Sequence, residues 1–266
     1  MINEKKMPLI DFRNITVIKD GRAILDNISL CVGADENIAI IGPNGSGKSS
    51  LIKVMTREYY PVADVSDLCM NVLGKELWNI FDLRKQMGII TTDLQNDCLR
   101  DNTVLEIVLS GYFSSIGIYD DFFDVTIEMR AMANEVLKFL GIFHLANQKM
   151  TKISSGEARK ALIARALVHD PKALVLDEPT NSLDMKSIDQ FRKTVSSIAN
   201  AGKNIILVTH DLSDIIPEIN RVILIKNGRV FADGKKEDIL TNEKLTDLFE
   251  VPVTVQKHGK YYSAFC

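Results

Sequence analysis

The chain has 266 residues, of which 46% are hydrophobic and 25% are charged, and its formal net charge at pH 7 is −3. This length can bury a substantial core, and the slightly acidic balance gives no general reason to bind nucleic acid, whose recognition normally begins with a basic surface. No apolar run reaches the roughly 18 residues that a membrane-spanning helix needs, and residues 1–8 lack the apolar segment of a secretion signal. A cytoplasmic location is therefore expected.

The first part of the chain predicts β structure followed by a phosphate-binding loop. Runs rich in Ile, Val and Leu over residues 9–32 are broken at Lys19-Asp20-Gly21, which indicates antiparallel strands joined by a turn. Residues 37–41 are typical of a buried parallel strand, and residues 49–55 can begin a helix. Between them lies GPNGSGKS, residues 42–49, which matches the pattern GxxxxGK[ST] in the strand, loop and helix context that the motif requires.

Each residue type in this loop suits a polyphosphate. Glycines allow backbone N–H groups to approach the phosphates closely. Lys48 can place its ammonium on the β- and γ-phosphates, and Ser49 can offer its hydroxyl to a magnesium ion that bridges them. A plain glycine turn is the alternative, which the surrounding strand and helix disfavour. The residues predicted to contact the nucleotide here are Gly42, Pro43, Asn44, Gly45, Ser46, Gly47, Lys48, Ser49 and Ser50.

The middle of the chain changes from mixed to helical character. An apolar segment at residues 67–73, a helix at 75–85 and a strand at 87–91 are predicted first. From residue 103 to about 150 the periodicity is helical throughout, and it opens with a capping box formed by Thr103 and Glu106. We interpret residues 93–150 as a helical subdomain inserted into an α/β core.

The core then resumes. A helix at residues 157–168, a strand at 173–176, a helix at 185–200 and a strand at 204–208 alternate, which predicts a parallel sheet. Residues 221–233 predict a β-hairpin that turns at Asn227-Gly228. The predicted fold class is an α/β core with a mainly parallel sheet, an antiparallel β edge and an inserted helical subdomain. Its parts would be residues 1–92 and 151–234 for the core, 93–150 for the subdomain and 235–266 for a C-terminal tail.

Polar side chains follow two of the predicted strands, at the end where parallel sheets bind ligands. Asp177 would hold the magnesium ion, directly or through water, and Glu178 could orient and deprotonate the water that attacks the γ-phosphate. A solvated acidic turn is the alternative. His210 follows the strand at 204–208 and could contact the γ-phosphate, although a lone histidine at such a place is more often structural.

A second capping box lies just before the helix at 157–168. Ser154 and Glu157 would fix the N-terminus of this helix, which is an anion site by geometry and dipole. Taken alone, this feature would be a capped helix and nothing more.

In this order the motifs resemble those of the nucleotide-binding subunits of ABC transporters, and the resemblance extends from about residue 9 to residue 233. It identifies residues 153–157 with the family's signature motif, Asp177 with the magnesium ligand and Glu178 with the catalytic glutamate. It also identifies residues 182–184 with the D-loop and His210 with the switch histidine. Together with Lys48, Glu178 and His210 form the predicted catalytic set.

The resemblance also implies the cofactors and partners. ATP and Mg²⁺ are the expected cofactors, and two such domains pair head to tail, as a homodimer or with another ABC ATPase subunit. The signature helix of one then closes over ATP on the phosphate loop of the other. Integral membrane transport subunits would hold the chain on the cytoplasmic face of the membrane. The implied ATP contacts in this part are Ser154, Ser155, Gly156, Glu157 and Asp184.

Three places depart from the family's pattern. The signature usually reads LSGGQ, whereas Ser155 here replaces the first glycine and Glu157 the glutamine. The Q-loop glutamine, a third magnesium ligand, should follow the strand at 87–91; Thr92 stands there and Gln95 lies three residues later, so both stay candidates. The aromatic residue that stacks on adenine falls near residues 17 and 18, which are aliphatic.

The function implied is an ATPase subunit that powers transport through a separate membrane subunit. Residues 109–117 and 247–253 weakly resemble molybdate-type and metal-chelate importer ATPases, which favours import of a metal chelate or an oxyanion. Two alternatives stay open: a soluble ABC ATPase without a membrane partner, and a nucleotide-gated interaction module with little turnover.

Overall fold

The computed structural model describes residues 7–63, 66–98, 101–118 and 123–266. The chain forms two compact units, one from Met1–Ile80 with Asn204–Cys266 and the other from Phe81–Lys203. The second unit contains the predicted helical segment, residues 93–150, together with strands and helices that we had assigned to the core. The finer subdivision of the chain stays a prediction.

The antiparallel edge predicted for residues 9–32 is present in the first unit. Three strands are paired in the order β2-β1-β4, and all the pairings are antiparallel. Along β1, buried and more exposed residues largely alternate, as expected for a strand with one face in the core. The turn between β1 and β2 is made by Asp20 and Gly21, which both have positive φ angles. The bounds are β1 (Ile10–Lys19), β2 (Arg22–Val32) and β4 (Cys69–Val72).

A second sheet in the same unit is mainly parallel, as predicted. β3 (Ile38–Ile41) pairs in parallel with β7 (Asn204–Thr209) on one side and with β8 (Arg221–Lys226) on the other. All residues of β3 and β7 are buried, which fits their continuous apolar sequences. β9 (Arg229–Lys235) pairs antiparallel with β8, and helix α1 (Lys48–Met55) follows the loop after β3. The register places Ile41 opposite both Thr209 and Leu224.

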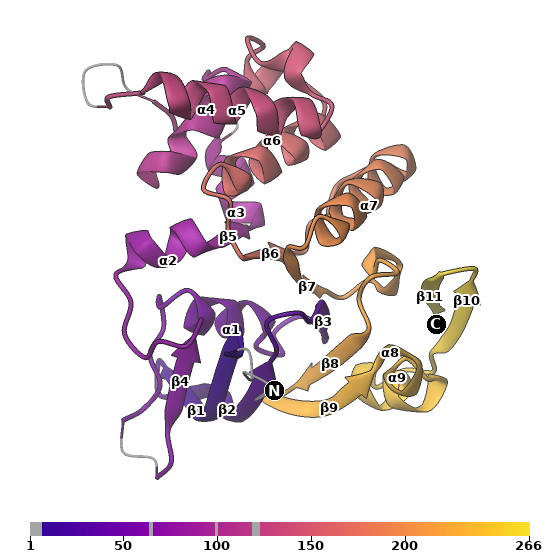
Figure 1. Cartoon of the computed structure of the whole chain (residues 1–266). Helices are drawn as coiled ribbons and strands as arrows, with labels where there is room; N and C mark the ends of the chain where they lie inside the picture. Colours follow the sequence, from indigo (N-terminus) through magenta and orange to yellow (C-terminus); the bar gives the residue numbers. More distant parts are fainter. Residues whose placement is uncertain (1–6, 64–65, 99–100, 119–122) are drawn as a thin grey trace, which may run out of the picture. The chain divides into compact units, whose positions relative to one another are not determined.

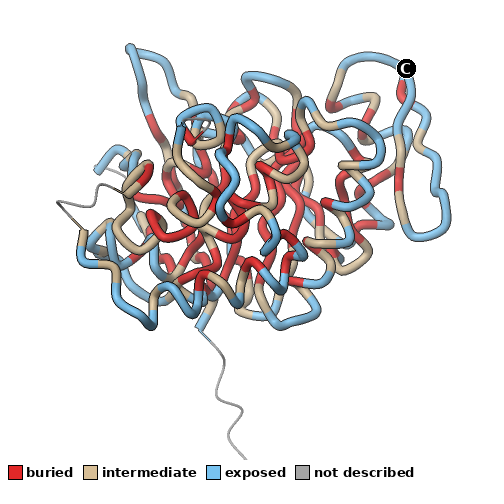
Figure 2. The backbone as a smooth tube through the Cα atoms, turned by 90° about the horizontal axis from the view of Figure 1, so that it is seen from above, coloured by how far each residue is buried: buried red, intermediate tan, exposed pale blue. Residues whose placement is uncertain are grey.

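The C-terminal tail has more regular structure than its sequence suggested. Helix α9 packs against β8, and the last strand packs against the short helix η4 (Leu212–Asp214). Leu245 and Leu248 are the residues of α9 that are buried. Most residues of the final hairpin are exposed, as the colouring near the C-terminus in Figure 2 shows. The elements are α8 (Lys236–Ile239), α9 (Asn242–Phe249), β10 (Thr254–His258) and β11 (Tyr261–Phe265).

The second unit combines a parallel strand pair with helices. β5 (Met87–Ile90) and β6 (Ala173–Asp177) are in parallel register, with Ile90 opposite Leu176. α6 is the central helix, because α4, α5, α7 and β5 all pack against it. The helices, seen in Figure 1, are α2 (Ile80–Gln86), α3 (Thr92–Cys98), α4 (Val104–Ser110), α5 (Ile127–Phe139), α6 (Ser155–Leu167) and α7 (Met185–Asn200). Short 3-10 helices lie at Gly111–Phe113, Phe143–Leu145 and Met150–Lys152.

The prediction of a helix from residue 75 was wrong at its start, because α2 begins at Ile80. The backbone of Lys75 is instead paired with Val72, each N–H donating to the carbonyl of the other at 3.1 Å. The Trp78 indole N–H also donates to the Val72 carbonyl, at 2.8 Å. These bonds hold residues 75–78 in a turn against the end of β4, so the helix starts later.

Gly88 tests how closely β5 is packed. A Cβ atom at this position would lie 2.6 Å from Leu174 Cδ2 and 2.9 Å from the carbonyl oxygen of Ala166. We expect Gly88→Ala to lower the free energy of unfolding by about 1–3 kcal/mol, the usual cost of overpacking. Urea unfolding measures this change. The control is Gly234→Ala in β9, where the nearest atom would be Ile239 Cδ1 at 3.4 Å, an ordinary contact; equal losses in the two variants would contradict the prediction.

Candidate functional site

The phosphate loop connects β3 to α1 and is closed around its own lysine. The Lys48 Nζ donates to the carbonyl oxygens of Gly42 at 2.8 Å and Pro43 at 3.1 Å, and the residue is only 5% exposed. The Ser46 N–H donates to the Pro43 carbonyl at 3.2 Å, which tightens the turn. A buried ammonium is thus held at the place where the motif predicts phosphate.

Space, as well as backbone conformation, requires glycine at two positions of the loop. A Cβ atom on Gly42 would lie 2.3 Å from the carbonyl oxygen of Ile225 and 2.5 Å from Ser46 Oγ. Gly47 has a φ of 107°, and a Cβ there would lie 2.9 Å from the carbonyl oxygen of Ile24. Side chains at these positions would push the loop away from the strands behind it.

The N-terminus of α1 is open to an anion. Gly47 is its N-cap, so no side chain caps the first turn, and that turn contains no acidic residue. The first N–H groups of a helix have no helical partners and carry the positive end of its dipole. Beside them, Ser46 Oγ is buried and makes no hydrogen bond to any residue that the structure describes. Such a set of donors next to Lys48 fits the phosphates of a nucleotide.

His210 lies at the same edge of the sheet as the phosphate loop, because it follows Thr209, the partner of Ile41 in the parallel register. The Thr209 hydroxyl donates to Asp214 Oδ2 at 2.7 Å and accepts from the Asp211 N–H at 3.0 Å. These bonds fix the turn after β7. His210 itself is exposed.

In the second unit, β5 and β6 deliver the other predicted residues to one edge. Asp177 ends β6, and Glu178 follows with a φ of 45°, a left-handed conformation that costs a non-glycine residue roughly 1–3 kcal/mol. The Asn181 side-chain amide donates to Glu178 Oε2 at 2.6 Å. Sequence reasoning did not assign Asn181 a role, although a polar amide three residues after the carboxylate was visible. It restrains the predicted catalytic carboxylate.

The two candidates for the Q-loop residue both lie in α3 and differ in their exposure. Thr92 is exposed at the first position of the helix, whereas Gln95 is half-buried. Gln95 Oε1 is buried and has no hydrogen-bond partner among the described residues. Buried amide oxygens are nearly always paired, and Mg²⁺ binds oxygen ligands of this kind. This arrangement favours Gln95 over Thr92 as a magnesium ligand.

The predicted capping box at the start of α6 is present. Glu157 N–H donates to Ser154 Oγ at 3.3 Å, while Glu157 Oε2 accepts from the Ser154 N–H at 2.8 Å and from its hydroxyl at 2.7 Å. The hydroxyl, and then the N–H, lower the pKa of the Glu157 carboxyl. Ser154 and Ser155 are exposed, so this end of the helix is open to a binding partner.

Ser187, which sequence reasoning missed, joins the signature segment to residues 182–184. Its N–H donates to Asp184 Oδ1 at 2.7 Å, and Asp184 is the N-cap of α7. The Ser187 hydroxyl, and then this N–H, lower the pKa of the Asp184 carboxyl. A Cβ atom on Gly156 would lie 2.7 Å from Ser187 Oγ and 3.0 Å from Ser187 Cβ, so a side chain there would crowd the start of α7. Asp184 and the signature helix are therefore neighbours within the second unit.

The site residues form two sets, one in each compact unit. The phosphate loop and His210 belong to the first unit. Gln95, Asp177, Glu178, Asp184 and the signature segment belong to the second. Of the two aliphatic residues predicted beneath adenine, which lie in the first unit, Val17 is buried and Ile18 is 56% exposed. Ile18 is thus the one that a base could contact.

Comparisons with known proteins assign this arrangement to a family. The family model described as ABC transporter matches residues 25–181. The uncharacterized ABC transporter ATP-binding protein YlmA of Bacillus subtilis (strain 168) is 33% identical over 250 residues, which are 93% of each chain. The chain belongs to the family of ABC transporter ATP-binding proteins.

One further relative and one solved structure are similar to this ABC ATP-binding subunit over most of its length. The hemin import ATP-binding protein HmuV of Escherichia coli O157:H7 is 29% identical over 266 residues, covering 96% of this chain and 97% of that protein. The structure of the ADP conformation of MJ1267, an ATP-binding cassette of an ABC transporter, matches with a TM-score of 0.77 at 26% identity, covering 92% and 98% of the two chains. This likeness confirms the predicted fold class. None of the helices in the described residues is long and apolar enough to cross a membrane.

The capping box of α6 predicts a pH-dependent stability. Glu157→Ala should lower the free energy of unfolding by about 1 kcal/mol at neutral pH, because two bonds to Ser154 are lost. The pKa of Glu157 is lowered in the folded chain. Its contribution is therefore present above the pKa of an unfolded glutamate, about 4.3, and is lost as the pH falls through the folded value.

Urea unfolding at neutral pH and at about pH 3, below the ordinary glutamate pKa, measures the difference between the two conditions. Glu243→Ala is the control, because Glu243 lies in the first turn of α9 but forms no capping box. A penalty for Glu157→Ala that does not shrink at low pH would contradict the prediction.

Proposed function

We propose that this ABC ATP-binding subunit binds and hydrolyses Mg-ATP and thereby powers import of a small solute through a separate integral membrane subunit. The observation that carries the proposal is Lys48, a buried ammonium held over the phosphate loop at the open N-terminus of α1. The carboxylates at the end of β6 supply the groups that hydrolysis needs.

Binding of ATP exchanges hydrogen bonds within the loop for bonds to phosphate. Lys48 would turn from two neutral carbonyl oxygens to the β- and γ-phosphates, where the acceptor carries a full negative charge and the attraction to the ammonium is stronger. The N–H groups at the start of α1 and the hydroxyls of Ser49 and Ser50 would hold the same oxygens. Ile18 offers exposed aliphatic surface to the adenine.

Ser49, Asp177 and Gln95 would hold the magnesium ion, since their hydroxyl, carboxylate and amide oxygens are the ligands that Mg²⁺ prefers. A magnesium ion held by these residues would neutralise the negative charge that develops on the phosphates during hydrolysis. The lack of a partner for Gln95 Oε1 among the described residues supports this ligand set.

Glu178 would orient the attacking water and accept its proton, and Asn181 keeps the carboxylate in one position. His210 would contact the γ-phosphate from the end of β7. Ser154, Ser155, Gly156 and Glu157 of one copy, with Asp184 nearby, would close over the ATP of a second copy or of a paired ABC ATPase subunit. Each site would then form only when two domains meet.

The relatives support the transport part of the proposal. A protein with hemin import in its name is similar over nearly the whole chain, and hemin is a metal chelate. We infer a solute of that class and a position on the cytoplasmic face, beside the membrane subunit that carries it.

Glu178→Gln should separate binding from hydrolysis. The variant keeps the phosphate loop and an oxygen that Asn181 can reach, so it should bind ATP with unchanged affinity. Loss of the base should slow phosphate release by about 10²-fold or more. Release assays and titration with ATP measure the two effects. In the control variant Lys48→Ala the affinity for ATP should fall instead; phosphate release by Glu178→Gln at the native rate would sink the assignment.

The membrane partner is tested by isolating the tagged chain from its native cells in mild detergent with Mg-ATP present. Mass spectrometry should find an integral membrane protein in stoichiometric amount. If the membranes are fully solubilised and only the chain itself or soluble proteins are recovered, the transport role is contradicted. A soluble ABC ATPase then becomes the better interpretation.

A further inference from the structure

The turn between β8 and β9 is hydrogen-bonded to the phosphate loop. The Gly228 N–H donates to the carbonyl oxygen of Ser46 at 2.8 Å, and the Gly228 carbonyl accepts from the Asp26 N–H at 2.8 Å. Gly228 has a φ of 74°, and a Cβ atom on it would lie 2.8 Å from the carbonyl oxygen of Ile24. The turn therefore packs backbone to backbone between β2 and the loop.

This bond sets the direction of a phosphate-binding group. In a planar trans peptide, the C=O of one residue and the N–H of the next point in opposite directions. Fixing the Ser46 carbonyl toward Gly228 thus fixes the Gly47 N–H away from the turn. Gly47 is the N-cap of α1, and its N–H belongs to the group of donors predicted to bind phosphate.

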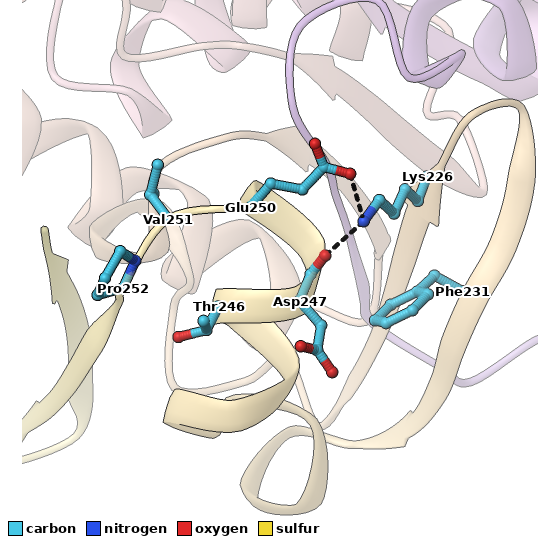
Figure 3. A pocket seen from close by; sticks show the side chains of 7 residues that line it. All are labelled: Lys226, Phe231, Thr246, Asp247, Glu250, Val251 and Pro252. Carbon is cyan, nitrogen blue, oxygen red and sulfur yellow. Dashed lines mark hydrogen bonds and ion pairs between the residues drawn. The ribbon is translucent and has the colours of Figure 1, made fainter.

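The turn is itself held by two cations that face each other across the hairpin, Lys226 and Arg229. Arg229 pairs with Asp26 of β2 through both Nε and Nη2. Lys226 Nζ reaches the end of α9, where it donates to the Asp247 carbonyl at 2.5 Å and pairs with Glu250 Oε1 at 2.8 Å. Figure 3 shows the ammonium between these two groups.

The bond to the Asp247 carbonyl is the stronger restraint of the two. It satisfies one of the last carbonyls of α9, which have no partner within the helix. Glu250 is 74% exposed beside an open pocket of about 510 Å³ that Phe231, Val251 and Pro252 also line (Figure 3), so water screens its ion pair.

We propose that the C-terminal end of α9, Lys226 and Gly228 form a brace that positions the phosphate loop for nucleotide. The bond from Lys226 to the Asp247 carbonyl attaches the end of β8 to α9. The position of this strand end sets the position of the β8–β9 turn, in which the Gly228 N–H binds the Ser46 carbonyl of the phosphate loop. Lys226 is a positioning residue, because it touches the loop only through the turn. The inference rests on the proposed function in one respect: the loop must bind the phosphates of ATP.

The test is Lys226→Met, which keeps the aliphatic stem and removes the ammonium. Titration calorimetry with a non-hydrolysable ATP analogue should give a Kd raised roughly three- to tenfold, the loss expected from one charge-assisted bond that acts indirectly. Turnover at saturating ATP should stay within about twofold, since Lys226 contacts no reacting atom. Lys226→Arg should restore most of the affinity.

Arg221→Met is the matched control. Arg221 lies at the other end of the same strand and is bonded to Asp233 at 2.7 Å and to Glu36 at 2.9 Å. This variant should lower the melting temperature and leave the Kd unchanged. An unchanged Kd in Lys226→Met, or an equal rise in Arg221→Met, would overturn the brace.

Two more variants keep the test decisive. Glu250→Gln removes only the exposed ion pair, so it should raise the Kd less than Lys226→Met does. If Lys226→Met fails to fold, Lys226→Gln, which removes the charge but keeps a polar side chain, takes its place, and an unchanged Kd in that variant overturns the brace. Lys48→Ala, measured alongside, should lose affinity if the loop binds ATP. A native chain that binds no analogue would overturn the proposed function, whereas native binding with an unaffected Lys226→Met overturns the brace alone.

Discussion

Strand β3 is four residues long, is paired in parallel on both of its edges and has every residue buried. A strand held in this way cannot slide by one residue without moving its apolar side chains into the wrong positions. The end of β3 therefore places Gly42, and the phosphate loop begins at a fixed point. The same register brings Thr209 to that edge, and His210 follows it.

The neighbouring strand also limits the sequence of the loop. A Cβ atom on Gly42 would meet the Ile225 carbonyl of β8, so the first glycine of the motif is required by the sheet before any nucleotide binds. Gly47 is required in the same way by Ile24 of β2. Part of what makes the phosphate motif recognisable is thus the packing of the strands behind it.

Features set by neighbours in sequence could be predicted, and features set by tertiary contacts could not. The capping boxes of Thr103 with Glu106 and of Ser154 with Glu157 each link residues three apart, and both are present. The same holds for the Asn227-Gly228 turn, whose two positive φ angles the dipeptide favours. The contacts of Gly228 with Ser46 and of Gly156 with Ser187 join segments that are distant in sequence. No local sequence pattern predicts such contacts. The preference for Gln95 over Thr92 as the Q-loop residue rests on the burial of the Gln95 side chain. The sequence periodicity of a short helix does not reveal such burial.

The altered signature has a chemical consequence for a composite site. The Ser154 hydroxyl has one proton, and it donates that proton to Glu157 Oε2. Under the proposed function the same hydroxyl would donate to the γ-phosphate on a second copy, so it must first leave Glu157. A carboxylate accepts more strongly than the amide of the usual glutamine, and it also places a negative charge near an incoming phosphate. Under the proposed function, closure of the dimer would therefore require more binding energy from ATP here than with glutamine at this position, and residue 157 would help to determine how readily the signature segment engages.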